Sequence, residues 1–171
     1  MEKFQNSIEF NEIITDLKNK NFSEALKKIK PASLNYPNEN LILKLYAIIY
    51  FNLNQWENAI KYYKKILNFE KDLYKIFTNI GVSYFKLGKI NQSIDAFKNS
   101  IKNNPNFGLA HNNLGISYLE LGMYEKALDQ FITALKLNDN DYQAQTNLIN
   151  TFNLNKPKVS DEHPLIEIND K

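Results

Sequence analysis

The stretch IGVSYFKLGK (residues 80–89) returns 34 positions later as LGISYLELGM (residues 114–123). In both copies a glycine follows an aliphatic residue, a tyrosine stands three positions further on, and a second glycine comes four residues after the tyrosine. A looser copy with Tyr46, Ala47 and Tyr50 lies one period earlier. A fixed period of this length predicts stacked supersecondary units, each of which buries its apolar face against its neighbours.

Each copy is followed by a small residue and, four positions later, by an aromatic one. These pairs are Ala59 and Tyr63, Ser93 and Phe97, and Ala127 and Phe131. Apolar residues recur at intervals of three and four, which predicts amphipathic helices. We expect first helices over residues 41–53, 74–87 and 109–121, and second helices over 56–69, 90–103 and 124–137.

The turn inside each expected helix pair carries a residue that tolerates the left-handed conformation. Gly88 and Gly122 occupy this place in two pairs and Asn54 in the third, and such residues end helices. Gly81 and Gly115 have a different role: they are expected to be small because two helix backbones approach each other closely there.

In this register the chain resembles the tetratricopeptide repeats. The best copy matches the family pattern at Phe77, Ile80, Gly81, Tyr84, Ser93, Phe97 and Pro105. The resemblance implies an all-α solenoid of antiparallel helix pairs wound into a right-handed superhelix. Its expected units are an atypical N-terminal repeat (1–39), three repeats (40–73, 74–107, 108–141), a C-terminal capping helix (142–153) and a flexible tail (154–171). Pro31 is expected to kink or end the second helix of the first unit near Lys30.

Composition excludes several classes of function. The 21 basic and 19 acidic residues give a net charge of +2, and every basic residue is lysine, so neither a basic patch nor guanidinium groups suggest nucleic-acid binding. Cysteine is absent, which excludes disulfides and thiolate sites. The most apolar run, 41–53, contains Lys44 and Asn52 and is shorter than a bilayer span. We therefore expect a cytoplasmic protein that does not bind a membrane.

No arrangement of residues predicts catalysis, a metal site or a cofactor. His111 occupies the repeat position at which the family usually has tryptophan, so we expect it to serve packing. His163, in the expected tail, has no organised partner nearby in the sequence. With no glycine-rich phosphate loop and no nucleophile beside a base, the chain is predicted not to be an enzyme.

In the family, first helices line a concave groove in which partners usually bind, and this identifies the candidate site. Ile48, Phe51, Val82, Phe85, Ile116 and Leu119 form an apolar stripe along it, and exposed stripes of this kind mark interaction surfaces. The polar residues of the expected groove are Lys44, Lys75, Asn79, Lys86, Asn112, Asn113 and Asn147. The predicted function is a non-catalytic scaffold that binds a peptide or a segment of a partner protein.

Two family mechanisms were compared with this groove. Asn11, Asn79, Asn113 and Asn147 share one repeat position, and such an asparagine ladder holds peptide backbones in the superhelix of protein O-glycosyltransferases. The carboxylate clamp of chaperone-binding members needs five polar positions, of which only Lys44 and Asn79 match. Ile48, Leu109 and Asn113 stand at the other three, which excludes that clamp.

Two further functions remain open. The chain resembles the N-terminal repeat arrays that position substrates for glycosyl- and sulfotransferases, and residues 163–168 would then begin another element. Alternatively, Leu165, Ile166 and Ile168 dock in the groove of a neighbouring copy and form a homo-oligomer.

Overall fold

The computed structural model describes residues 4–37 and 39–155. Within these ranges a short 3₁₀ turn, Phe4–Asn6, precedes nine α-helices, and no strand forms. The helices are α1 (Ile8–Lys18), α2 (Phe22–Asn35), α3 (Asn40–Asn52), α4 (Trp56–Ile66), α5 (Leu73–Lys86), α6 (Ile90–Asn103), α7 (Gly108–Glu120), α8 (Tyr124–Leu137) and α9 (Tyr142–Leu154). The prediction of an all-α protein built from helix pairs is confirmed.

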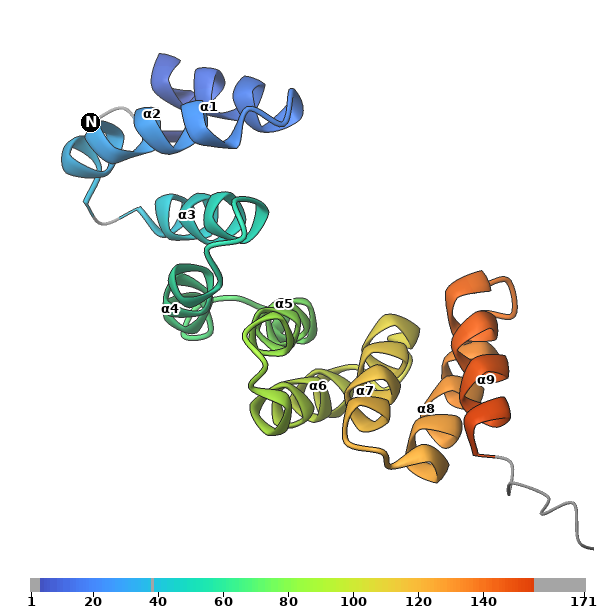
Figure 1. The fold of residues 1–171 in the computed structure, drawn as a ribbon. Coiled ribbons are helices and arrows are strands. Elements are labelled where there is room, and N and C mark those ends of the chain that lie inside the picture. Colours follow the sequence, from blue (N-terminus) through green and yellow to red (C-terminus); the bar gives the residue numbers. More distant parts are fainter. Residues whose placement is uncertain (1–3, 38, 156–171) are drawn as a thin grey trace, which may run out of the picture.

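Consecutive helices pack against each other and build a curved array. Figure 1 shows α3, α5, α7 and α9 along the inner side of the arc and α4, α6 and α8 along the outer side. The first helices of the pairs therefore form the concave face, and the second helices form the convex face. The expected tail lies, apart from its first two residues, outside the described residues.

The turns inside the pairs have the predicted left-handed residues. Asn54 has a φ of 58°, and Gly88 and Gly122 both have a φ of 69°. After each of them, the next backbone N–H donates to the carbonyl of the tyrosine five residues before it, for example from Lys89 to Tyr84 over 2.9 Å. This bond closes the end of the first helix and turns the chain into the second.

The same turn recurs at a residue that the sequence did not suggest. Lys20, with a φ of 59°, ends α1, and the N–H of Asn21 donates to Asp16 over 2.8 Å. Lys20 lies 34 residues before Asn54, so the N-terminal pair keeps the geometry of the others. A side chain with a Cβ is strained in this conformation by about 1–2 kcal/mol.

Two expected helix ends differ from the structure. The α2 helix does not end near Lys30 but continues through Pro31 to Asn35. Ile29 and Ala32, both buried, hold the helix on either side of the proline, which offsets the lost backbone hydrogen bond. The α4 helix ends at Ile66 rather than at residue 69, because the N–H groups of Phe69 and Glu70 both turn back to the Ile66 carbonyl.

The core explains the repeated small residues. A Cβ added to Gly81 would lie 2.5 Å from the ring of Phe97, and one added to Gly115 would lie 2.5 Å from the ring of Phe131. The close neighbour of each glycine is thus an aromatic ring of the second helix and not, as expected, a helix backbone. The glycine and the aromatic residue form one packing unit in each of these two pairs.

Candidate functional site

The six residues of the predicted apolar stripe lie on the first helices α3, α5 and α7 and keep part of their surface exposed. Ile48 is 41% exposed, and the other five members are partly exposed. None of the six stripe residues is buried; they are Ile48, Phe51, Val82, Phe85, Ile116 and Leu119. Phe51 packs edge-on against Trp56 and Tyr63, so one of its faces is already anchored.

Three of the predicted groove residues meet at one small cavity between α3, α4 and α5. The cavity has a volume of about 150 Å³. Its lining consists of Lys44, Ile48, Tyr63, Ile66, Glu70, Ile76 and Asn79. The structure therefore brings Lys44, Ile48 and Asn79 together, and it adds two polar residues, Tyr63 and Glu70, which the sequence reasoning did not place in the site.

The polar groups of this cavity are held by direct contacts. Lys44 Nζ lies 2.8 Å from Glu70 Oε1. Asn79 Nδ2 donates to the Tyr63 hydroxyl over 3.1 Å. Burial raises the pKa of Tyr63 to about 12, and the hydrogen bond from Asn79 lowers it by less. The hydroxyl is therefore protonated at neutral pH, and Asn79 keeps its amide oxygen and its second N–H for another partner.

One feature of the sequence indicates that the Tyr63 hydroxyl takes part in a polar contact. It occupies the register position of Phe97 and Phe131 and differs from them by a hydroxyl group. A buried hydroxyl needs a hydrogen-bond partner, and Asn79 on the neighbouring α5 supplies it.

The remaining groove lysines differ in their surroundings. Lys75 Nζ lies 2.8 Å from Asp72 and sits over the ring of Tyr74, and its hydrogen bond to Asp72 raises the pKa of Lys75. Lys86, at the end of α5, is exposed, and no ion pair forms at its side chain within the described part of the chain. Lys86 is thus the groove lysine whose charge is not matched by a neighbouring carboxylate.

The expected asparagine positions are only partly on the surface. Asn112 is 1% exposed and accepts a hydrogen bond from Asn147 Nδ2 over 3.0 Å, so it does not line the groove. The residue one period earlier, Thr78, is also buried and bonds to Ser100 of α6. In these two repeats the position points between helices, whereas Lys44, one period before Thr78, is partly exposed. Asn113 and Asn147 are partly exposed.

His111 is a packed residue with both ring nitrogens engaged. It is 8% exposed; Nδ1 lies 2.9 Å from the Gln130 side chain and Nε2 lies 2.9 Å from the Pro105 carbonyl. A carbonyl oxygen only accepts, so Nε2 carries a proton. Among the described residues no group of three His, Cys, Asp or Glu side chains is placed to hold a metal ion.

Comparison with known families agrees with the geometry of the helix pairs. The sequence pattern of the tetratricopeptide repeat matches residues 74–107 and 108–141, and a second pattern of the same description matches residues 10–72. The chain belongs to the tetratricopeptide repeat family. No curated protein matches the chain.

Solved structures of other tetratricopeptide repeat proteins share this fold. A crystal structure of MamA has 20% sequence identity and a TM-score of 0.73, and the match covers 86% of this chain and 84% of that one. The first repeat domain of Spaghetti (RPAP3), bound to the HSP90 peptide SRMEEVD, has 23% identity and a TM-score of 0.63 over 67% of this chain and 91% of that one. A structure of the Cut9–Hcn1 hetero-tetramer of the APC/C has 19% identity and a TM-score of 0.72, and the match covers 81% of this chain and 28% of that one.

Family membership supports a role as a protein-interaction scaffold, because tetratricopeptide repeats are generally non-catalytic interaction modules. In the described part of the chain, every helix is too short or too polar to cross a membrane.

Proposed function

We propose that this tetratricopeptide repeat protein is a non-catalytic scaffold that binds an extended segment of a partner protein along its concave groove. The observation that carries the proposal is the open apolar stripe: all six side chains are exposed in part, on first helices that lie along the inner side of one arc (Figure 1). Full burial of one exposed aliphatic or aromatic side chain contributes about 1.5–3 kcal/mol. Because these side chains are already partly covered and association itself costs free energy, binding requires that several of them are buried together.

The polar groups of the groove orient the bound segment. Asn79, Asn113 and Asn147 each retain amide groups that pair with a peptide backbone irrespective of its sequence. Lys44 and Lys75 are already paired with acidic neighbours. A preference for a negatively charged partner therefore rests mainly on Lys86.

The groove is not built for the acidic C-terminal peptides that a carboxylate clamp holds. Lys44 lies against Glu70 at 2.8 Å, and Ile48 occupies a place where the clamp needs asparagine. The RPAP3 domain in the structural comparison binds the peptide SRMEEVD. We expect no measurable binding of that peptide by this chain, and calorimetric titration checks this.

The binding test begins with the selection of ligands from a library of displayed peptides against the purified chain. Phe85→Asp places a charge in the middle of the stripe, at a side chain that is partly exposed. We expect an affinity loss of about 30-fold or more, as for a central interface residue, with unchanged helicity. Leu34→Asp, at an 81% exposed leucine on α2, is the matched control and should bind normally. Full binding by the Phe85 variant would exclude the groove as the site.

A further inference from the structure

The last helix, α9, occupies the register of a first helix whose partner is missing from the described residues. Leu148 and Ile149 lie 34 positions after Leu114 and Gly115. In the preceding pair, Gly115 faces the ring of Phe131 from the second helix. At α9 the equivalent residue, Ile149, is 60% exposed. The face that a second helix covers in the other pairs is therefore open here.

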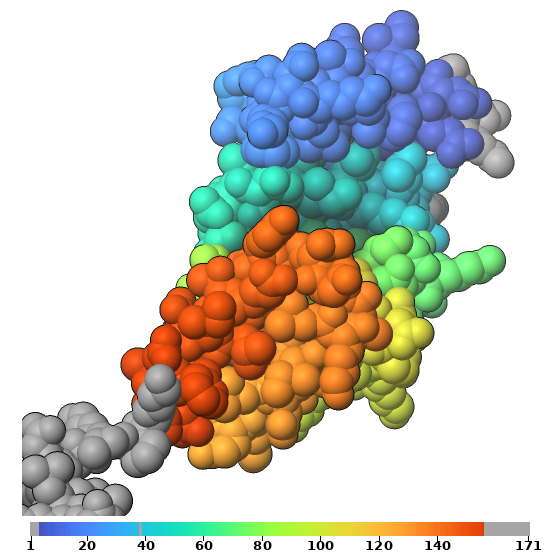
Figure 2. All heavy atoms as spheres, turned by 90° about the vertical axis from the view of Figure 1, so that its right-hand side faces the viewer, coloured from blue at the N-terminus to red at the C-terminus, as the bar shows by residue number. Residues whose placement is uncertain are grey.

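This open face forms the largest of the described clefts. It lies between α8 and α9 and has a volume of about 600 Å³. Its lining is apolar except for two carboxylates, and the residues are Glu125, Leu128, Asp129, Ile132, Leu148, Ile149 and Phe152. Figure 2 shows α8 and α9 in the foreground, below the N-terminal helices. The helix expected to cap the array thus leaves Ile149 and Phe152 largely exposed.

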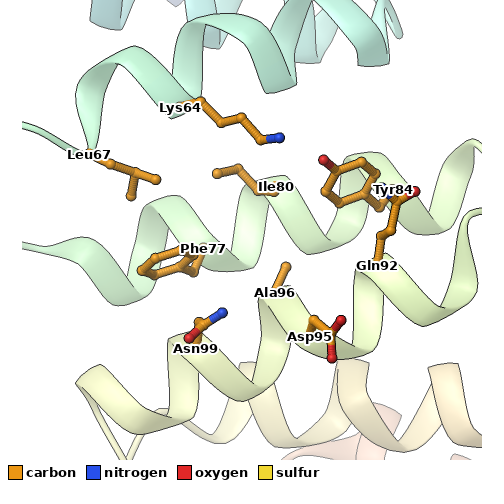
Figure 3. Close-up of a pocket in the computed structure, with 9 residues that line it drawn as sticks. All are labelled: Lys64, Leu67, Phe77, Ile80, Tyr84, Gln92, Asp95, Ala96 and Asn99. Atoms are coloured by element: carbon orange, nitrogen blue, oxygen red, sulfur yellow. The ribbon is translucent and has the colours of Figure 1, made fainter.

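An earlier pocket in the array shows what completes such a cleft. The pocket in Figure 3 has three walls: Lys64 comes from α4, Ile80 from α5, and Ala96 from the second helix α6. Two periods later, Ile132 and Leu148 stand in the places of Lys64 and Ile80. The helix equivalent to α6 would span residues 158–171, which lie outside the described residues.

We propose that residues 164–168 of the same chain dock in the α8–α9 cleft, in the place that the second helix holds in the preceding pairs. Leu165 falls on the register position of Phe97 and Phe131. Leu165 and Ile168 are three residues apart, so a helical turn presents both to the cleft and directs Glu167 away from it. Pro164 suits the first position of such a turn.

The length of the connection favours this occupant. Leu165 lies ten positions after Asn155, the residue next to α9, and ten residues of extended chain reach about 33 Å. A tether this short gives an effective concentration in the millimolar range, so even weak docking is populated. The proposal concerns a surface separate from the concave groove and does not depend on the proposed function.

The absence of native cysteine allows a direct test with one spin label on the full chain. Asn169→Cys carries the nitroxide, and isoleucine methyl spectra report on the cleft. We expect strong broadening of the Ile132 and Ile149 methyl signals, independent of protein concentration. The methyl signal of Ile8, at the opposite end of the array, should remain sharp. Unbroadened cleft signals would overturn the proposal.

Two controls separate docking within one chain from the alternatives. Adding Leu165→Asp and Ile168→Asp to the labelled chain should abolish the broadening, whereas Val159→Asp, outside the docking segment, should leave it unchanged. Broadening that persists in the double variant contradicts the assigned contacts. In a mixture of spin-labelled chains and isotope-labelled chains without the spin label, broadening of the cleft signals would show a second copy as the occupant and would overturn docking within the chain.

Discussion

Substituting Gly115 by alanine tests the packing unit on which the helix pairs depend. The added Cβ would lie 2.5 Å from Phe131 Cε1, and two further ring atoms lie within 3 Å. Phe131 is fully buried, so its ring has little room to move. Overpacking of this kind costs about 1–3 kcal/mol, and the tight contact favours the upper half of that range.

Alanine also has a higher helix propensity than glycine, which contributes about 1 kcal/mol in the opposite direction. The net destabilisation expected for Gly115→Ala is therefore about 1–2 kcal/mol. For a chain of this size that lowers the midpoint of thermal unfolding by roughly 2–8 °C. Circular dichroism during heating and urea unfolding measure this change.

Gly108→Ala is the matched control in the same helix. A Cβ at Gly108 would lie 3.5 Å from the Ala134 carbonyl, which is ordinary contact, so we expect no loss of stability. Combining Gly115→Ala with Phe131→Leu should cost less than the sum of the two single changes, because the smaller side chain makes room for the methyl group. If Gly115→Ala is as stable as Gly108→Ala, the ring does not fill the space above the glycine and the reasoning fails.

Three further changes probe other parts of the array. Lys20→Gly should stabilise the protein by about 1 kcal/mol, because it removes the strain of a left-handed lysine. Lys18→Gly, at the exposed last residue of α1, should not stabilise it, because glycine has the lower helix propensity. Equal stabilisation by both changes in urea unfolding would contradict this. Ser117→Ala should lower the free energy of unfolding by about 1–3 kcal/mol, because it leaves the buried hydroxyl of Ser93, 2.8 Å away, without its partner. Adding Ser93→Ala should restore part of this loss. If the effects of the two substitutions simply add, the two hydroxyls are not coupled. Burial raises the pKa of Tyr63 from 10.0 to about 12. The stability that the protonated Tyr63 hydroxyl contributes is therefore complete below about pH 10 and is lost as the pH rises towards 12. Tyr63→Phe should lose less stability than the wild type between these pH values, and identical curves of stability against pH would refute the raised pKa of Tyr63.

The sequence predicted the features that depend on local chemistry. Gly88, Gly122 and Asn54 are residues that adopt the left-handed conformation readily, so the turns could be located without coordinates. Lys20 adopts the same conformation against its own preference, and only the 34-residue register points to it. Similarly, a rule about proline predicted a kink or an end of α2 near Lys30, whereas the helix continues through Pro31 to Asn35 with buried residues on either side of the proline.

The sequence predicted which side chains lie on the first helices but not the polar contacts of the candidate site. The apolar stripe follows from repeat positions alone, because first helices share one face. Whether a side chain at such a position is exposed depends on neighbouring helices: Asn112 is buried by its bond to Asn147 on α9. The pairing of Lys44 with Glu70 likewise joins α3 to the loop that follows α4, and no local pattern indicates it.

The most direct test of the central claim is a map of chemical-shift changes on the isotope-labelled chain during titration with a selected peptide ligand. The account predicts that the largest changes fall on Ile48, Val82, Phe85, Ile116 and Leu119. These residues belong to α3, α5 and α7, which Figure 1 shows along the inner side of the arc. Changes concentrated on the outer helices α4 and α6, with these five residues unaffected, would contradict binding in the concave groove.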